Sequence, residues 1–419
     1  MLRKDAKILR KDAEDITQRR RRGYPFFSAS LRPPWRLCVN SRNFAPIMAI
    51  PWEWIVLSSF SFITLVQLFY YLFFFSRLAF FKIKHKEQTQ EHPVSVVICA
   101  RDEASNLAVN LPGVLVQNYR STHEVLLVND NSQDETKYLL EGLHKQFRQL
   151  NVIELKQEAK LIPGKKFPLS VGLKTAKYEV VLLTDADCVP ASEFWIQKMQ
   201  EPFQNGVEIA LGYGAYHKKK GILNKIIRFD TFHSAMQFLS YAIAGVPYMG
   251  VGRNLAYKKE LFYRHKGFSS HNHIPGGDDD LFINMAANSK NTTVVLDHEA
   301  FTLSIPEPNF SRWYKQKTRH YSTARYYKAG HRFLLALYSF SQFVFYPLFV
   351  AALIMADWRI VLGIFGLRLV TQTVIYYKSM RKLDEKDLFP WFVLFDIGIF
   401  FFYIIFFPAT LKKPKAVWK

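Results

Sequence analysis

Cysteine is scarce in this sequence of 419 residues. The three cysteines, Cys38, Cys99 and Cys188, lie far apart and form no Cys-x-x-Cys pair. This spacing argues against a disulfide framework and a structural zinc site, and it agrees with a reducing, cytoplasmic environment. Glycine and proline number only 19 each, whereas 37 Phe and 21 Tyr bring the aromatic share to 16%. The composition therefore excludes a disordered chain, a collagen and a small disulfide scaffold.

Charge is nearly absent from four long stretches, which are 54–76, 333–356, 360–377 and 388–411. Arg368 interrupts the third stretch and Asp396 the fourth. A helix needs about 20 apolar residues to cross the hydrocarbon core of a membrane, and none of the four has the polar face of a surface helix. The pattern predicts an N-terminal transmembrane helix within 48–81 and a C-terminal transmembrane region of about three helices within 333–411.

Acidic residues are in the minority, with 35 Asp and Glu against 56 Lys and Arg, for a net charge of +21. Much of the excess flanks the apolar stretches or lies in residues 1–47 and in the basic tail 412–419. Basic residues beside apolar spans favour the cytoplasmic face of a membrane. We therefore expect an integral protein of the inner or plasma membrane that contacts membrane lipids and binds no nucleic acid. Residues 1–47 are interpreted as a leader before a start at Met48, or else as a basic cytoplasmic tail.

Residues 92–325 have an ordinary globular composition. Short apolar runs at 93–100, 124–128 and 179–183 read as buried strands, and helical patterns alternate with them. Alternation of this kind predicts an α/β fold with a mostly parallel sheet, which binds ligands at the carboxyl ends of its strands. The central segment is therefore expected to be a cytoplasmic α/β domain.

Two acidic motifs stand out in this domain. Asp185 and Asp187 follow the third apolar run, where two carboxylates can share Mg²⁺ or Mn²⁺ and its diphosphate ligand. The run Asp278-Asp279-Asp280 places three carboxylates side by side, so repulsion should raise at least one pKa toward that of a general base. The same run also suits an acidic helix N-terminus, and both interpretations can hold.

A basic, aromatic segment at 312–320 precedes the second apolar stretch. By itself it predicts an interfacial helix that anchors the domain to lipid. Alternatively, Gln316 and Arg319, which share one face of such a helix, point toward a diphosphate or a sugar.

In their order along the chain, these segments resemble the family 2 glycosyltransferases of the GT-A fold. The resemblance is to the membrane-integrated group that includes cellulose, chitin and hyaluronan synthases and ceramide glucosyltransferase. It covers roughly residues 92–325 and rests on the motifs Arg101-Asp-Glu103, Asn129-Asp130, Gly164-Lys165, Asp185-Ala-Asp187, Gly252-Arg-Asn254, Gly277-Asp-Asp-Asp-Leu281 and Gln316-Lys-Thr-Arg319.

The resemblance implies an inverting transfer from a nucleoside-diphosphate sugar, with a UDP-sugar expected. It implies that Glu103 and Asp130 hold the nucleotide base, that Lys165 lies near the nucleotide, and that Asp185 and Asp187 contact the nucleotide and its metal. Alignment of Asp280-Leu281 with the family pattern places the catalytic base at Asp278, with Asp279 as the alternative one residue away and Asp280 near the substrate. Gln316 and Arg319 are expected at the donor diphosphate and the acceptor end.

Two positions depart from the family pattern: Asn129 replaces an aspartate, and His320 replaces a tryptophan. Loss of the flat tryptophan surface favours non-processive transfer to a lipid-linked or membrane-proximal acceptor. The alternatives are a processive polysaccharide synthase, a non-catalytic scaffold that binds nucleotide sugars, and a transporter suggested by Arg368 and Asp396. Four simple crossings would place the basic tail opposite a cytoplasmic domain, so a segment around Arg368 or Asp396 could instead lie in the interface.

Overall fold

A seven-stranded sheet lies at the centre of the domain, in the order β3-β2-β1-β4-β8-β6-β9. The computed structural model describes residues 51–83, 90–156 and 164–411. The predicted leader 1–47, the first residues (48–50) of the predicted N-terminal transmembrane segment and the basic tail 412–419 lie outside the described residues. The strands of this sheet are β1 (Val94–Ala100), β2 (His123–Asp130), β3 (Leu150–Leu155), β4 (Val180–Asp185), β6 (Ile209–Leu211), β8 (Leu255–Lys258) and β9 (Thr292–Val294).

The first four strands in this order are parallel, which confirms the predicted α/β fold with a mostly parallel sheet. Strand β8 differs, because it runs antiparallel to both β4 and β6. All seven residues of β1 are buried, since helices cover both faces of the sheet and leave no solvent-facing row. Val97 and Cys99 belong to one hydrophobic core and the even-numbered residues of β1 to another, as the two-residue period of a strand requires.

Helices pack around this sheet. Three short strands outside it form a second sheet. The second sheet has the order β5-β10-β7 and consists of β5 (Cys188–Pro190), β7 (Gly214–Tyr216) and β10 (Thr302–Ser304). The helices of the domain are α4 (Ala104–Leu115), α5 (Thr136–Gln146), α6 (Lys166–Thr175), α7 (Trp195–Gln200), α8 (Ile222–Ile243), α9 (Lys259–Arg264), α10 (Asp280–Ala286) and α11 (Phe310–Tyr321).

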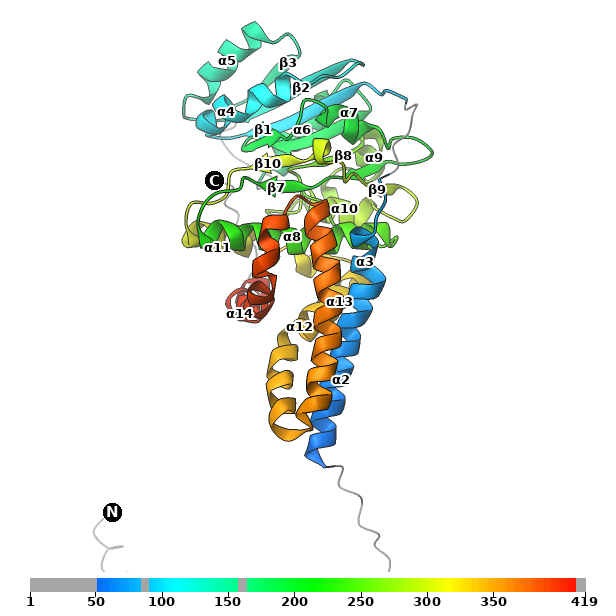
Figure 1. The fold of residues 1–419 in the computed structure, drawn as a ribbon. Helices are drawn as coiled ribbons and strands as arrows, with labels where there is room; N and C mark the ends of the chain where they lie inside the picture. The colour runs from blue at the N-terminus through cyan, green and yellow to red at the C-terminus, as the bar shows by residue number, and fades with distance from the viewer. Residues whose placement is uncertain (1–50, 84–89, 157–163, 412–419) are drawn as a thin grey trace, which may run out of the picture. The chain divides into compact units, whose positions relative to one another are not determined.

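Four apolar helical segments lie on one side of the domain (Figure 1). Among the described residues they are long and apolar enough to cross a membrane, which confirms the four candidate spans in the sequence. They comprise α2 (Trp52–Phe69) with a π-helical turn (Tyr70–Phe75) and α3 (Ser76–Ala79), then α12 (Ala329–Met355), α13 (Trp358–Lys382), and the 3-10 turn η5 (Lys386–Trp391) with α14 (Phe392–Leu411).

The domain and the apolar helices share one core. Helix α8 lies between the sheet and the helical bundle (Figure 1), and its buried Phe229 and Phe232 contact Tyr376 of α13. The buried Arg228 of α8 forms ion pairs with Glu385 and Asp387 in the connection between α13 and α14. Packing and buried charge together hold the domain on the helices that follow it in sequence.

The two charged residues inside the apolar stretches pair with each other. The Arg368 guanidinium lies 2.9 Å from the Asp396 carboxylate, and both side chains are buried. Gln67 and Gln372 complete the hydrogen bonds of this pair. Buried charges that are paired and fully hydrogen-bonded fit a structural role, because the loss of one partner would leave an uncompensated charge. This arrangement weighs against a transported ion as the reason for Arg368 and Asp396.

Candidate functional site

Three strand ends meet at one edge of the large sheet. In the register of the parallel strands, Cys99 of β1 is opposite Asp185 of β4, and Ala100 is opposite Asn129 of β2. The segment after β1, Asp130 at the end of β2 and the motif after β4 therefore lie side by side. The alternation of strands and polar loops in the sequence predicts that these strand ends lie together. The register shows which residues are opposite one another.

The loops after β1 and β2 are tied together by short hydrogen bonds. The Asp102 backbone N–H donates to Ser132 Oγ at 2.9 Å, and the Gln133 N–H donates to Asp102 Oδ1 at 2.7 Å. Asn129 uses both ends of its amide, because Nδ2 donates to Glu154 and Oδ1 accepts from Ser132. The residue that departs from the family pattern thus braces the loop that follows the buried Asp130. Glu103, just before α4, accepts from Asn106 Nδ2 at 2.5 Å.

Asp185 and Asp187 are held in different ways. Asp185 forms an ion pair with Lys165 at the start of α6. Asp187 accepts from Ser304 Oγ of β10 at 2.9 Å and from the Cys188 thiol at 3.4 Å. Burial tends to raise the pKa of Asp185, but the Lys165 ammonium outweighs it and the pKa falls below its ordinary value. Burial and the nearby Asp185 charge raise the pKa of Asp187.

These two carboxylates fit a divalent cation. One ligand atom each from Asp185, Asp187 and Cys188 lie within 4.8 Å of one another. Carboxylate oxygens are the ligands that Mg²⁺ and Mn²⁺ prefer, and a cation would relieve the repulsion that raises the pKa of Asp187. The donor set therefore fits the predicted metal through its two aspartates, while the soft sulfur of Cys188 adds little to such a site.

Arg253 is a residue that sequence reasoning missed, although it lies within the Gly252-Arg-Asn254 motif. Its backbone carbonyl accepts hydrogen bonds from Thr184 and Thr302, which fixes it between the two sheets. Its guanidinium lies 4.4 Å from the Tyr216 ring centroid and close enough to Asp185 to lower the pKa of that carboxyl. Within the described residues its buried Nη1 atom has no hydrogen-bond partner. A guanidinium nitrogen in that position suits a phosphate oxygen.

The three-aspartate run forms the start of α10 and its members point to different partners. Asp279 is the N-cap of that helix, because Oδ1 accepts from the Asp280 N–H and Oδ2 from the Gly252 N–H, both at 2.7 Å. Asp280 accepts from Thr323 Oγ1 at 2.5 Å and from Tyr327 Oη at 2.7 Å. In the part of the chain that the structure describes, no group donates a hydrogen bond to the Asp278 carboxylate.

Electrostatics distinguish the three aspartates further. Burial, together with the charges of Asp278 and Asp280, raises the pKa of Asp279 to about 8. Burial also raises the pKa of Asp280. The Asp185 carboxylate and, to a smaller extent, Asp278 raise the pKa of Lys165 against the effect of burial, so Asp278 also lies near this lysine. The run therefore forms a helix N-terminus and also contains carboxyl groups with raised pKa values, and these are the two features that the sequence predicts for it.

A buried lysine and a histidine hold the loop that leads into this run. Lys166 Nζ donates to the carbonyls of His271 and Ile274 at 2.7 and 2.6 Å. His271 Nε2 lies 3.0 Å from the Gly277 carbonyl, so the ring carries its proton on that nitrogen. Gly277 has φ +87°, and a Cβ atom there would lie 2.3 Å from Leu281 Cδ1. Adjacent lysines at the start of α6 thus contact both acidic motifs, Lys165 through Asp185 and Lys166 through the loop before Asp278.

His271 gives this loop a dependence on pH. Burial and the Lys166 charge lower the pKa of His271 to about 4, whereas an unfolded histidine titrates near 6.5. Between these values the unfolded chain binds more protons, so the free energy of unfolding should fall as the pH falls from about 6.5 to 4, by up to about 3 kcal/mol. We expect His271→Gln, whose amide can still donate to Gly277, to lose less thermal stability between pH 7 and pH 5 than the parent.

The matched control is His273→Gln, because His273 is exposed two residues away. Thermal unfolding of the purified protein in lipid nanodiscs at both pH values gives the comparison. An equal loss of melting temperature in the parent and in His271→Gln would contradict the assignment.

Gln316 and Arg319 lie on α11, which Asn309 caps through a hydrogen bond to the Arg312 N–H. Gln316 Oε1 accepts from Tyr216 Oη at 3.4 Å, and Tyr216 lies beneath Arg253. Arg319 is near enough to Asp185 to lower its pKa. The helix is fixed from its other side by the Lys317–Asp230 ion pair of 2.7 Å. The predicted face of α11 thus reaches the acidic edge through Tyr216 and Arg319.

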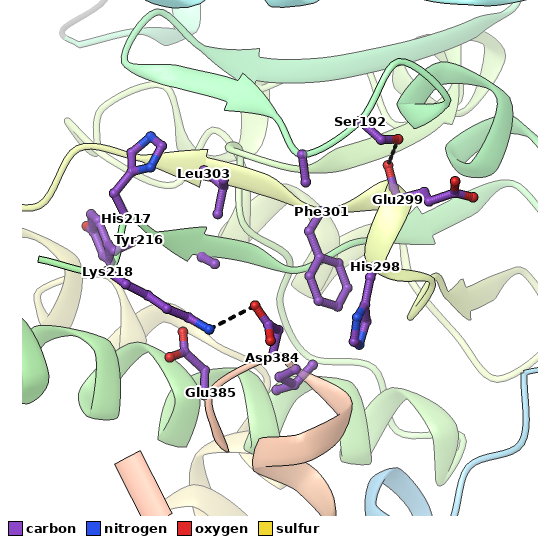
Figure 2. Close-up of a pocket in the computed structure, with 13 residues that line it drawn as sticks. Ser192, Tyr216, His217, Lys218, His298, Glu299, Phe301, Leu303, Asp384 and Glu385 are labelled. Carbon is purple, nitrogen blue, oxygen red and sulfur yellow. Dashed lines mark hydrogen bonds and ion pairs between the residues drawn. The ribbon is translucent and has the colours of Figure 1, made fainter. Parts of the chain in front are cut away.

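A hollow of about 370 Å³ lies on the opposite face of the three-stranded sheet (Figure 2). Ser304 and Thr302 of β10 direct their hydroxyls toward Asp187 and Arg253, whereas Leu303 between them lines the hollow. Lys218 reaches Asp384 at 2.9 Å across its rim (Figure 2). Tyr216 also lines the hollow, so the hollow adjoins the acidic edge at this residue, while Asp185, Asp187 and Asp278 are not part of its lining.

The fold and the acidic edge define a GT-A domain attached to apolar helices. Residues 95–265 match the model of the glycosyl transferase family 2, so this part of the chain is a family 2 glycosyltransferase domain, as the motif order predicts.

Two curated relatives are the beta-monoglucosyldiacylglycerol synthases of Trichormus variabilis and of a Nostoc species. Each is 32% identical over 103 residues, which is 24% of this chain and 21% of the relative. The match thus spans about a fifth of the length of these relatives.

A solved structure with a similar fold is a mannosyltransferase from Pyrobaculum calidifontis in complex with GDP-Man and Mn²⁺. Its TM-score is 0.52 at 16% sequence identity, over 82% of this chain and 98% of the other. At this identity the likeness shows the fold alone.

Proposed function

We propose that this chain is an inverting glycosyltransferase that moves a sugar from a nucleoside-diphosphate sugar to a lipid-linked or membrane-proximal acceptor. The observation that carries the proposal is the meeting of Asp130, Asp185, Asp187 and Lys165 at one sheet edge, with Asp278 near enough to the same lysine to affect its pKa. Cations and carboxylates gathered in this way suit a nucleoside diphosphate on one side and an acceptor hydroxyl on the other.

The donor is proposed to lie along the strand ends. The loops after β1 and β2, with Glu103 and Asp130, flank the base, and Asp185 and Asp187 lie toward the diphosphate. Asp187, with Asp185, would hold Mg²⁺ or Mn²⁺, which supplies positive charge to the diphosphate when bound. The solved relative with the same fold contains Mn²⁺, and this supports the choice of metal.

Asp278 is the proposed base, because among the described residues no group donates a hydrogen bond to its carboxylate, whereas the carboxylates of Asp279 and Asp280 both accept hydrogen bonds. It takes the proton of an acceptor hydroxyl, whose oxygen forms a bond to the anomeric carbon as the bond to the diphosphate breaks on the opposite face. The leaving diphosphate keeps the electron pair, and Lys165, Arg253 and Arg319 stabilise its charge. Asp279 and Asp280 position Asp278: the first caps α10 and the second ties α10 to the segment between α11 and α12.

The acceptor is proposed to be a lipid for two reasons. The domain shares its core with helices that are apolar enough to lie in a membrane. The curated relatives, similar over one segment, are named as synthases of a glucosylated diacylglycerol. Transfer on the cytoplasmic side is consistent with the basic residues that flank these helices.

The experiment is a donor panel with the full chain in lipid nanodiscs. UDP- and GDP-sugars labelled in the sugar are supplied with Mn²⁺, and both nucleoside-diphosphate release and label in the organic extract are measured. We expect one donor to give lipid-soluble label that is absent with Asp278→Asn. Label in a water-soluble polymer would favour a processive synthase. Tight nucleotide binding without release from any donor would favour a non-catalytic scaffold.

A further inference from the structure

The last apolar helix, α14, does not follow the path of the other three. It starts beside α13, where the Phe392 ring centroid lies 5.9 Å from that of Tyr376, and Phe395 lies 4.8 Å from Phe229 of α8. Four residues into the helix, Asp396 pairs with Arg368 of α13. Up to this point α14 is part of the bundle and descends from the domain.

The second half of α14 returns to the domain. A straight helix antiparallel to α13 would place residue 406 about 21 Å further from the domain than residue 392, at 1.5 Å per residue. Instead, the Phe406 ring centroid lies 5.5 Å from Trp313, 5.2 Å from Tyr314 and 5.8 Å from Tyr321, all on α11. Figure 1 shows α14 ending nearer to the sheet than the far ends of α2 and α13.

This contact surface is a packed aromatic cluster. Tyr216, Ile227, Trp313 and Phe406 are all buried in it, and Phe402 packs at its edge. The ring centroids of Phe402 and Phe406 are 4.4 Å apart, so one turn of α14 presents two rings to the underside of α11. Tyr216 joins this cluster to the acidic edge, since its hydroxyl donates to Gln316.

We propose that α14 does not cross the bilayer but enters the leaflet next to the domain and returns beneath α11, where Phe402 and Phe406 hold the helix that carries Gln316 and Arg319. The topological part stands on contacts alone, and the positioning part rests on the proposed transferase function. Three crossings then leave the end of α14 on the same side as the domain. The four lysines of the sequence after residue 411 agree with this side, because basic residues favour the side of the membrane that holds a cytoplasmic domain.

The topology is tested by labelling single cysteines with a membrane-impermeant maleimide in intact and permeabilised cells. Lys415→Cys follows α14, Lys145→Cys reports the exposed surface of the domain, and Arg359→Cys reports the exposed start of α13. Cys38 is replaced by serine, while Cys99 and Cys188 are buried. We expect position 415 to label like 145 and opposite to 359. Labelling like 359, or from both sides, would overturn the proposal.

The positioning role is tested with Phe406→Ala and a matched Phe401→Ala, whose ring on the same helix is 58% exposed. We expect kcat to fall about tenfold in the first variant and by less than twofold in the second. Phe406→Leu should restore most of the activity, because it fills much of the same space.

A double variant separates positioning from general destabilisation. If Phe406 acts through α11, adding Phe406→Ala to Arg319→Lys should lower kcat by less than about twofold, because Arg319→Lys has already impaired that helix. If Phe406→Ala instead reduces the amount of folded protein, it should lower the apparent kcat by the full tenfold in either background. Full additivity would overturn the positioning role. Labelling needs no activity, so an inactive parent would count against the proposed function and leave the topological result valid.

Discussion

Asp278→Asn is expected to abolish sugar transfer, with kcat lower by about 10³-fold or more, while the affinity for the nucleoside diphosphate changes by less than about twofold. Asparagine has nearly the same shape as aspartate but cannot accept the acceptor's proton. The proposed nucleotide contacts lie with the strand ends and Lys165, which the substitution leaves in place. Steady-state kinetics with the donor identified by the panel, and calorimetric titration with the nucleoside diphosphate and Mn²⁺, measure the two quantities.

Asp279→Asn is the control that decides between the two candidate bases. Both Asp279 oxygens accept backbone N–H groups, and asparagine keeps only one of these oxygens, so this change should remove one hydrogen bond at about 1 kcal/mol of stability. Its melting temperature should fall and its kcat should fall much less than that of Asp278→Asn. If Asp279→Asn is inactive and folded while Asp278→Asn retains turnover, Asp279 is the base.

The acidic edge was predictable because parallel strands end together. Buried runs rich in β-branched residues can be read from the sequence, and each is followed by polar residues: Asn129 and Asp130 in one case, Asp185 and Asp187 in another. Parallel pairing then forces these ends into contact, whatever the sequence between them. The three-aspartate run was also recognisable, since repulsion between adjacent carboxylates requires a special environment.

The supporting residues were not predictable, because their contacts depend on register between distant segments. Ser304 reaches Asp187 only through the three-residue strand β10, which is too short to show a periodic pattern. Lys166 and His271 are 105 residues apart in sequence and have no spacing that would link them. Arg253 lies in the Gly252-Arg-Asn254 motif, but only the fold places its guanidinium near the two aspartates.

Hydropathy likewise predicts that α14 is an apolar helix, but it does not predict the direction in which the helix runs relative to the domain. Its residues 392–411 are as apolar as those of a crossing helix. The second half of the helix contacts specific partners on α11, the aromatic rings of Trp313, Tyr314 and Tyr321. Segment averages do not contain this information, because lipid and an aromatic protein surface are similarly favourable surroundings for phenylalanine.

Asp187→Asn is expected to remove the metal dependence of donor binding. Lys165 forms its ion pair with Asp185 and not with Asp187, and burial and the Asp185 charge raise the pKa of Asp187. A bound divalent cation would therefore stabilise the Asp187 carboxylate more than the Asp185 carboxylate, which already has a cationic partner. We expect the affinity for UDP or GDP measured with Mn²⁺ to fall by about a hundredfold and to approach the value measured with EDTA. Calorimetric titrations of parent and variant with and without Mn²⁺ give the comparison.

Ser304→Ala is the matched control, because it removes only the hydroxyl that donates to Asp187 at 2.9 Å. The loss of one such hydrogen bond costs about 1 kcal/mol, so affinity with Mn²⁺ should fall by less than about tenfold and the difference between Mn²⁺ and EDTA should remain. If Asp187→Asn still binds the nucleoside diphosphate more tightly with Mn²⁺ by the same factor as the parent, the cation is held elsewhere. Asp185 alone would then be the candidate, at the expense of its ion pair with Lys165.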